Sequence, residues 1–350
     1  MKYGREILKN VEGYVPGEQP RMPNIIKLNT NENPYPPSPK VMEALRGLSA
    51  DTLRKYPDPM SLELRKACAS RYGYDSADWV MVGNGMDELL AMAVRTFTDP
   101  GDTVLTTYPT YVLYETLAQL HGASAFLVDL DDAFQLTDAF YSTPARLCFL
   151  PRPNSPTGVC VPREAVERLC REFDGIVVID EAYVDFADDD CMGFPKRFEN
   201  AIVMRTFSKS FGLAGMRVGV AVARPEIIAE FVKTKDSYNL NVASQAAALA
   251  AMTDYTYMLN SRAKIRKTRA RLMAALTELG FSVPPSQSNF LLAQWNGQPN
   301  AKTIFERLRE RAIIVRYFPV RRLDNALRIT VGTEEETDAL LRALGEIVGK

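Results

Sequence analysis

The sequence is poor in the residues on which many catalytic and metal sites depend. Only one of its 350 residues is a histidine, His121, so neither a Ser-His-Asp triad nor a multi-histidine metal site is expected. That histidine ends a helical pattern just before Gly122, which is typical of a helix C-terminus. The five cysteines have no C-x-x-C spacing and an odd count, which argues against a zinc site and a disulfide framework. We therefore expect no metal, and reduced thiols in a cytoplasmic protein.

An excess of charge and a long apolar run are also absent. Lysine and arginine number 42 against 43 aspartates and glutamates, so the net charge of -1 provides no field to attract nucleic acid or an anionic membrane. The apolar runs, such as Val218 to Ala223, are too short to span a bilayer, and the N-terminus lacks the apolar region of a signal peptide. We predict a soluble protein that acts on small molecules and has no nucleic-acid or membrane partner.

The middle of the chain reads as alternating strands and helices. The run 176–180 is apolar up to Asp180, and a helix that begins at Pro162 separates it from an earlier apolar run, 146–150. A wholly apolar strand is typical of a parallel sheet that helices cover on both faces. From Phe281 onward the pattern changes, with predicted strands at 288–293, 313–318 and 327–331 and helices at 302–311 and after Thr333.

These patterns predict an α/β fold with two domains. We place a large domain with a mostly parallel sheet covered by helices at residues 40–241. We place a smaller α+β domain at residues 242–350, together with an N-terminal arm and loop of residues 1–39. The arginines and lysines of the predicted helix 261–279 are interpreted as a solvated face.

Polar residues follow four of the predicted strands. These residues are Tyr108, Asn154, Asp180 and Lys209. Because ligands of open α/β sheets lie outside the carboxyl ends of the strands, we expect the four side chains to converge there. An aromatic face at Tyr108 would suit a planar ring, although packing in the core is an equally good interpretation.

The stretch 205–217 centres on Lys209. A lysine held in a cleft can lose its proton and attack a carbonyl carbon to give a Schiff base. Ser208 and Arg217 are suited to a phosphate, and the Gly83-Asn-Gly85 turn before a helix is a second anion site. One molecule that combines an aldehyde with a phosphate is pyridoxal phosphate. The alternatives are an exposed Ser-Lys-Ser loop and, for the turn, a dinucleotide site, which the missing third glycine of that fingerprint disfavours.

Eight motifs, in this order and spacing, resemble those of the fold-type-I pyridoxal-phosphate-dependent aminotransferases over nearly the whole chain. The motifs are Asn31-Glu-Asn-Pro-Tyr35, Tyr56-Pro-Asp-Pro59, Gly85-Met-Asp-Glu88, Pro153-Asn-Ser-Pro-Thr-Gly158, Asp180-Glu-Ala-Tyr183, Thr206-Phe-Ser-Lys-Ser210 with Gly212-Leu-Ala-Gly-Met-Arg217, Tyr238-Asn-Leu-Asn241, and Leu327-Arg-Ile-Thr-Val-Gly-Thr333. Two departures are Arg152, where the family usually has asparagine, and Pro36, where it usually has glycine.

The resemblance implies roles for five residues around the cofactor ring. Lys209 would bond to the cofactor aldehyde and then carry the proton between the substrate carbon and the cofactor. Asp180 would pair with the pyridine nitrogen and keep it protonated. Asn154 and Tyr183 would donate hydrogen bonds to the 3′-oxygen, and Tyr108 would stack on the ring.

The resemblance also implies a phosphate site and a homodimer. Ser208, Arg217 and the backbone of Met86 and Asp87 would hold the phosphate. Tyr56 would reach that phosphate from the neighbouring subunit, so the active unit would be a dimer.

The implied reaction is a transamination between glutamate and imidazole acetol phosphate, which gives 2-oxoglutarate and histidinol phosphate in histidine biosynthesis. Arg328 would grip the acidic end of the substrate, with Arg316, Tyr14 and Asn154 as further substrate-binding residues. The alternatives within the fold are an aromatic-amino-acid aminotransferase and a threonine-phosphate decarboxylase-like enzyme. The alternatives from other classes are a nucleotide-binding oxidoreductase and a non-enzymatic binding protein, which an intact Asp180 and Lys209 disfavour.

Overall fold

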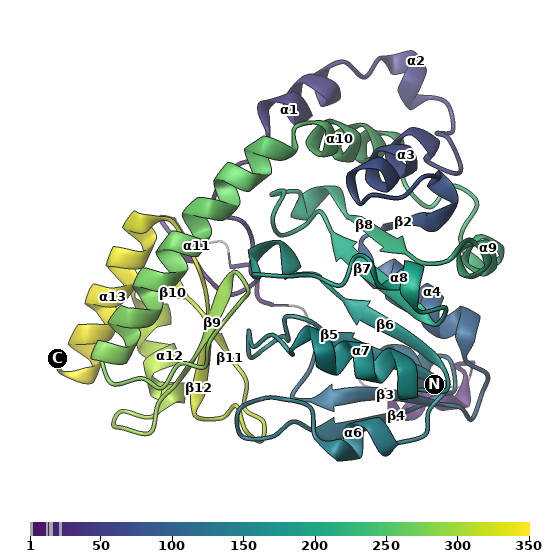
Figure 1. The fold of residues 1–350 in the computed structure, drawn as a ribbon. Helices are drawn as coiled ribbons and strands as arrows, with labels where there is room; N and C mark the ends of the chain where they lie inside the picture. The colour runs from purple at the N-terminus through teal and green to yellow at the C-terminus, as the bar shows by residue number, and fades with distance from the viewer. Residues whose placement is uncertain (1–2, 12, 14–16, 21–22) are drawn as a thin grey trace.

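The computed structural model describes residues 3–11, 13, 17–20 and 23–350, and it confirms the predicted fold class (Figure 1). A seven-stranded sheet with strand order β2-β8-β7-β6-β5-β3-β4 forms the centre. All neighbouring strands are parallel except β8, which runs antiparallel to both β7 and β2. The strands are β2 (Val80–Asn84), β3 (Thr103–Tyr108), β4 (Ser124–Asp129), β5 (Leu147–Pro151), β6 (Ile176–Asp180), β7 (Ala201–Thr206) and β8 (Val218–Val222).

Helices cover both faces of this sheet, so nearly all residues of the central strands β5, β6 and β7 are buried. In β6, Val177 and Ile179 pack into the core on one face, and Val178 packs into the core on the other. One face carries α4 (Met86–Phe97), α5 (Leu113–Leu120) and α9 (Pro225–Thr234). The other carries α1 (Pro39–Arg46), α3 (Leu62–Arg71), α6 (Asp138–Ser142), α7 (Arg163–Glu172), α8 (Phe194–Arg197) and α10 (Val242–Thr253). Short elements join them: α2 (Ala50–Leu53), η2 (Ala77–Trp79), η3 (Val184–Phe186) and η4 (Ala214–Met216).

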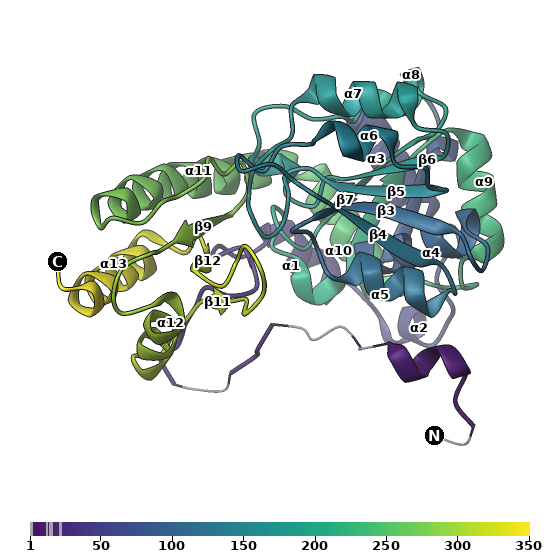
Figure 2. The same ribbon diagram turned by 90° about the horizontal axis from the view of Figure 1, so that it is seen from below.

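A smaller antiparallel sheet with order β11-β12-β9 lies beside the large one (Figures 1 and 2). Its strands are β9 (Phe290–Gln294), β11 (Arg316–Tyr317) and β12 (Ala326–Thr330), and α11 (Tyr255–Glu278), α12 (Ala301–Glu310) and α13 (Glu334–Val348) pack against it. The predicted capping box of Thr333 and Glu336 is present at the start of α13.

The predicted single strand 313–318 is wrong, because two short strands in different sheets replace it. β10 (Ile313–Ile314) pairs in parallel with β1 (Ile26–Lys27), whereas β11 pairs with β12. The chain changes partners at Val315, whose side chain is buried in the core. A run of residues with high strand propensity therefore does not imply a continuous ladder of hydrogen bonds.

The interpretation of helix 261–279 as a solvated face is confirmed for Lys264 and Lys267, which are exposed. It is wrong for the arginines described next. Arg269 of α11 donates to the carbonyl oxygens of Phe186 (3.1 Å) and Ser288 (2.8 Å), and burial lowers the pKa of Arg269 to about 10. Arg266 pairs with Asp188 on the large-sheet side, while Arg271 pairs with carboxylates of α13. The arginines therefore join α11 to both parts of the fold, since their long stems carry the charge to partners beyond the helix.

The first described residues of the N-terminal arm, 3–11, lie against the large domain and not against the smaller one. Its short helix η1 (Glu6–Asn10) packs on α5, and Arg5 donates to the carbonyl oxygen of Leu120 at 3.3 Å (Figure 2). Further along, Glu18 pairs with Arg309 of α12 and β1 pairs with β10, so these later residues reach the smaller domain.

Candidate active site

Asp180 lies at the carboxyl end of β6 with only 4% of its surface exposed. Its Oδ1 accepts the backbone N–H of Ala182 at 2.9 Å, and its Oδ2 accepts the hydroxyl of Tyr114. Burial raises the pKa of Asp180 to about 6, against the opposing effect of these two hydrogen bonds. No lysine or arginine of the described residues lies within ion-pair distance of this carboxyl group. The site thus holds a buried acid that a cationic ligand group would stabilise in its ionised form.

Lys209 follows the neighbouring strand β7 and faces the same end of the sheet. Its Nζ donates to the carbonyl oxygen of Thr30 at 3.2 Å and lies 5.6 Å from the centre of the Tyr183 ring. The hydroxyl of Tyr183 accepts a hydrogen bond from Asn31 at 3.0 Å. The loop that carries the motif Asn31 to Tyr35 therefore borders the lysine, which brings together two motifs that lie far apart in the sequence.

The residues predicted to hold a phosphate also lie together. The guanidinium of Arg217 donates to the hydroxyl of Ser208 (3.3 Å) and to a carboxylate oxygen of Asp87 (3.2 Å), which lies in the first turn of α4. Gly85 precedes that turn with a φ of +83°, and a Cβ at this position would come within 2.5 Å of the Arg217 guanidinium. Glycine is therefore required here, and the N–H groups that begin α4 face an arginine and a hydroxyl, as an anion site needs.

Asn154 is fully buried in the loop after β5. Its Nδ2 donates to the carbonyl oxygen of Pro109 at 3.1 Å, and its Oδ1 accepts the hydroxyl of Thr157 at 2.9 Å. Nδ2 also makes a longer contact with the Thr107 hydroxyl at 3.5 Å, so these neighbours together fix the amide plane at the carboxyl end of β5.

Tyr108, predicted to cover a planar ring, has other contacts. Its hydroxyl donates to the carbonyl oxygen of Arg321 at 2.8 Å, and the Arg321 guanidinium lies 4.5 Å from the ring centre. The tyrosine three residues later, Tyr111, instead reaches Asp87 of the anion site at 3.4 Å. Its ring stands at 88° to that of Tyr114, whose hydroxyl contacts Asp180.

Sequence reasoning missed both Tyr111 and Tyr114. The available signal was the spacing of three tyrosines, at 108, 111 and 114, where a strand end leads into a helix. Residues three apart lie on one side of a helical turn, so the last two would have been expected to act together.

The two predicted substrate arginines are direct neighbours in the smaller sheet, where Arg316 of β11 pairs with Arg328 of β12. Arg328 donates to the carbonyl oxygen of Asn29 (2.8 Å) and to the hydroxyl of Ser155 (3.3 Å), next to Asn154. Arg316 has no carboxylate within ion-pair distance among the residues that the structure describes, and its guanidinium packs on Phe318 at 5.2 Å. Tyr14, the third predicted residue, lies outside the described residues.

Tyr56 is 81% exposed and stacks on Tyr238 with ring centres 4.3 Å apart. Its neighbours Leu53 and Leu62 are exposed as well. These apolar side chains lie on the outside of this chain.

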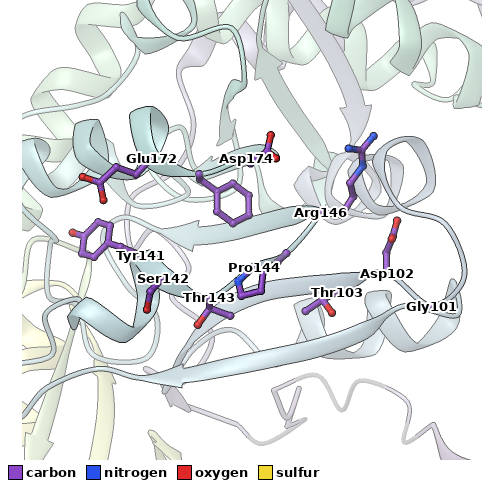
Figure 3. A pocket seen from close by; sticks show the side chains of 12 residues that line it. Gly101, Asp102, Thr103, Tyr141, Ser142, Thr143, Pro144, Arg146, Glu172 and Asp174 are labelled. Carbon is purple, nitrogen blue, oxygen red and sulfur yellow. The ribbon is translucent and has the colours of Figure 1, made fainter.

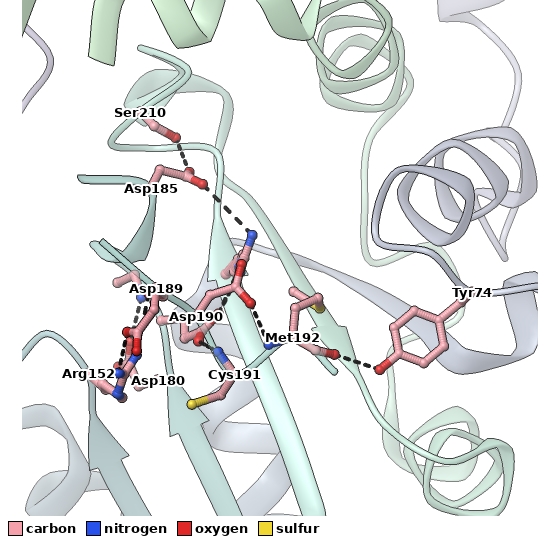
Figure 4. A network of polar contacts seen from close by, with 12 residues as sticks. Tyr74, Arg152, Asp180, Asp185, Asp189, Asp190, Cys191, Met192 and Ser210 are labelled. Carbon is pink, nitrogen blue, oxygen red and sulfur yellow. Dashed lines mark hydrogen bonds and ion pairs between the residues drawn. The ribbon is translucent and has the colours of Figure 1, made fainter. Parts of the chain in front are cut away.

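A network of charged side chains links the chain after β6 to β7 and the loop that follows it (Figure 4). Arg205 of β7 pairs with Glu181 at 2.8 Å and with Asp190 at 2.9 Å. Its third neighbour, Asp185, accepts the hydroxyl of Ser210, the residue after Lys209. The network therefore ties the loop after β6 to the loop that carries the lysine.

A surface cavity of about 550 Å³ lies at the other end of the sheet (Figure 3). Thr103 and Arg146, at the beginnings of β3 and β5, line it together with Glu172 and Asp174. It therefore contains none of the residues that converge at the carboxyl edge. Within the described residues there is no helix that could cross a bilayer and no cluster of three or more side chains that could hold a metal ion.

The fold and the position of the site place this protein among the α/β enzymes that bind a ligand at the carboxyl edge of an open sheet. A family model, aminotransferase class I and II, matches residues 23–344, so the chain belongs to that family.

Relatives of nearly the same length give the same family. The chain is 45% identical to the histidinol-phosphate aminotransferase of Synechocystis over 347 residues, which cover 99% of this chain and 98% of the relative. It is 44% identical to the enzyme of that name from Syntrophotalea carbinolica, with 98% and 99% covered. A crystal structure of histidinol-phosphate aminotransferase from Sinorhizobium meliloti in complex with pyridoxal-5'-phosphate superposes with a TM-score of 0.90 at 27% identity, and covers 100% of this chain and 98% of that one.

Proposed function

We propose that this protein is a pyridoxal-phosphate-dependent aminotransferase of histidine biosynthesis. It interconverts histidinol phosphate and 2-oxoglutarate with imidazole acetol phosphate and glutamate. The full-length similarity to relatives of that name supports the choice of substrate. The observation that carries the choice of cofactor is the buried Asp180. Among the described residues no cation lies within ion-pair distance of it, and it shares a sheet edge with Lys209 and the Arg217 anion site.

The residues present fit pyridoxal phosphate at both of its ends. Arg217, Ser208 and the N–H groups at Met86 and Asp87 would hold the phosphate, with Gly85 leaving the space for the arginine. Asp180 would hold the ring nitrogen, since a buried carboxylate without a counter-charge favours a protonated partner. When bound, the cofactor supplies an aldehyde that takes up amino groups and a protonated ring that withdraws electrons from the substrate carbon.

We assign the remaining contacts of the ring to three side chains. Asn154 and Tyr183 would face the 3′-oxygen. The Tyr183 hydroxyl accepts a hydrogen bond from Asn31 and keeps its own proton to donate, and the Asn154 amide is fixed at the carboxyl end of β5, next to β6. For the face of the ring we propose Tyr111 in place of Tyr108, because Tyr111 lies between the anion site and the Asp180 group. Tyr108 instead joins the large sheet to the loop before β12.

Lys209 is the group that moves the proton. Its Nζ is held 3.2 Å from the Thr30 carbonyl oxygen, and the Asp185–Ser210 hydrogen bond fixes the loop beside it. A free amine in this position can accept the proton of the substrate carbon and return it to the neighbouring carbon of the cofactor. Arg328 would grip the carboxylate of glutamate and the phosphate of histidinol phosphate in turn, and Arg316 would add a second guanidinium for the phosphate.

We also propose that the enzyme works as a homodimer in the cytoplasm. The exposed group of Leu53, Tyr56, Leu62 and Tyr238 is apolar, which suits a surface that a second copy covers. Tyr56 from that copy would then complete the phosphate site. All five cysteines are free thiols, which suits a reducing compartment.

The test of the substrate is a coupled assay with 2-oxoglutarate as acceptor. Histidinol phosphate, phenylalanine and tyrosine are compared as amino donors, and release of carbon dioxide from threonine phosphate is measured in parallel. We expect kcat/KM to be highest for histidinol phosphate. A clear preference for an aromatic amino acid, or decarboxylation as the faster reaction, would reject this assignment and favour one of the two other activities.

The test of the dimer is mixing of two inactive variants. Lys209→Ala and Tyr56→Ala subunits are exchanged, and a heterodimer should regain one intact site and part of the activity. Subunit exchange is verified separately with a differently tagged wild-type chain. Exchange without any recovery of activity would contradict a shared site.

A further inference from the structure

Tyr114 contacts Asp180, the residue proposed to hold the ring nitrogen of the cofactor. It belongs to α5, a helix that covers one face of the large sheet. It lies in the first turn of α5, it is 0% exposed, and its hydroxyl donates to Oδ2 of Asp180. Its ring stacks on Phe149 of β5, with centres 4.8 Å apart and planes at 11°, and it also packs on the ring of Tyr111, with centres 5.6 Å apart and planes at 88°. The hydroxyl is therefore fixed in place and cannot turn away from the carboxylate.

The carboxylate of Asp180 accepts fewer hydrogen bonds than it can. Oδ1 accepts one backbone N–H and Oδ2 accepts one hydroxyl, while a carboxylate can accept about four hydrogen bonds. Both donors are neutral, so they stabilise the negative charge of the carboxylate without cancelling it. The charge remains available to a cationic partner, and each oxygen can still accept one more donor.

We propose that Tyr114 is a positioning residue that keeps Asp180 ionised and thereby holds the proton on the ring nitrogen of the cofactor. The inference rests on the proposed function, because it concerns the cofactor of the same site. A bare carboxylate in so dry a place would compete with the ring for the proton, because burial disfavours its charge. The hydroxyl makes the carboxylate a weaker base, so the ring stays protonated and withdraws electrons strongly.

The other groups around Asp180 do not replace this hydroxyl. The charge of Lys209 favours the ionised carboxylate, but Lys209 lies beyond ion-pair distance from Asp180, and the charge of Asp87 acts in the opposite direction. Burial, the Asp180 charge and the hydrogen bond together raise the pKa of Tyr114 well above its ordinary value. The Tyr114 hydroxyl therefore keeps its proton to a higher pH than an exposed tyrosine does.

The experiment uses holoenzyme loaded with pyridoxal phosphate that carries ¹⁵N in the ring. Tyr114→Phe removes only the hydroxyl and keeps the stacked ring. Tyr74→Phe is the matched control, because Tyr74 is also buried, at 5% exposure, and its hydroxyl donates to the Met192 carbonyl oxygen at 2.7 Å, away from the cofactor. The ¹⁵N chemical shift reports directly whether the ring nitrogen carries a proton.

We expect wild type and Tyr74→Phe to have the signal of a protonated ring. Loss of a hydrogen bond to a charged group raises the titration of Asp180 by about one to two pH units. The Tyr114→Phe signal should therefore move toward the free-base position, and kcat should fall by about tenfold at equal cofactor occupancy. An unchanged signal in Tyr114→Phe would overturn the inference.

A second variant covers the case in which Tyr114→Phe does not fold or does not load. Tyr114→His keeps a neutral donor at this position, and we expect the signal of a protonated ring. A free-base signal in loaded Tyr114→His would likewise overturn the inference. Both outcomes differ from failure of the proposed function, in which wild-type protein would not bind pyridoxal phosphate at all.

Discussion

Asp180 and Glu181 are neighbours in the sequence, but they serve opposite sides of one strand end. Both are buried, at 4% and 1% exposure. Among the described residues, Asp180 receives hydrogen bonds from two neutral donors, Tyr114 and Ala182. Glu181 instead receives Arg205 at 2.8 Å and the N–H of Cys191. The charge of Glu181 is therefore balanced within the protein, whereas the charge of Asp180 is available to a ligand.

The same distinction applies to the arginines. Burial disfavours the charge of Arg205, but the attraction of Glu181 and Asp185 outweighs it and raises the pKa of Arg205 well above its ordinary value. Arg316 has no such carboxylate among the described residues. Charges balanced within the chain hold the fold together, and charges without a partner mark the places where a substrate or cofactor completes the balance.

The strongest test of the comparison replaces Asp180 by asparagine. Asp180→Asn keeps the volume of the side chain but removes the charge that faces the ring nitrogen. We expect kcat to fall by about 10²–10³-fold, as for the loss of one fixed electrostatic partner of the reacting group. Steady-state kinetics at saturating cofactor measure the loss. Wild-type turnover by Asp180→Asn would show that this charge has no part in the reaction.

Glu181→Gln should have the opposite profile. It leaves Arg205 buried with only Asp190 and the more distant Asp185, and we expect a loss of about 3 kcal/mol in the free energy of unfolding. Urea denaturation of the cofactor-free protein measures this loss. The fraction that folds and binds cofactor should turn over within about threefold of wild type, since the change lies behind the site. A loss of kcat as large as that of Asp180→Asn would erase the distinction between the two acids.

The arginine half of the comparison is tested by substrate choice. Arg316→Ala should lower kcat/KM for histidinol phosphate by about ten- to hundredfold more than for glutamate, because one charge-assisted hydrogen bond to the phosphate is lost. Arg328→Lys should weaken both half-reactions, since lysine cannot form the two-pronged contact. Equal losses for both substrates in Arg316→Ala would mean that this arginine does not read the phosphate.

The smallest expected effect is a dependence of stability on pH in the cofactor-free enzyme. Burial raises the pKa of Asp180 from the ordinary 3.8 to about 6, so the folded state binds this proton more tightly than the unfolded state. Stability from this group is present at low pH and is lost as the pH rises through about 4 to 6. Between about pH 5 and 7 the loss is about 1–1.5 kcal/mol.

Unfolding of wild type and Asp180→Asn, both without cofactor, isolates this contribution, because the amide does not titrate. The difference between their free energies of unfolding should grow with pH in favour of Asp180→Asn. Parallel pH profiles would contradict the assignment of a raised pKa to Asp180.

The sequence allowed the large sheet to be predicted because its strands are short apolar runs between turns and amphipathic helices. The edge strand β4 was missed, since Ser124 to Asp129 mixes exposed polar residues with Phe126, and only its pairing with β3 makes it a strand. The two strands β10 and β11, found in place of the predicted single strand 313–318, also depend on pairing. Their partners, β1 and β12, are not visible in the local sequence pattern.

The sequence by itself determined the alternation of elements, the motifs and the strand ends, because these depend on periodicity and on local turn chemistry. It therefore brought Asp180, Asn154 and Lys209 to one edge of the sheet. Only the tertiary structure decided which tyrosine contacts which group. The path of the chain after β3 places the hydroxyl of Tyr108 at Arg321, that of Tyr111 at Asp87 and that of Tyr114 at Asp180. The partners that separate Asp180 from Glu181 also come from other elements of the fold, and no local pattern could report them.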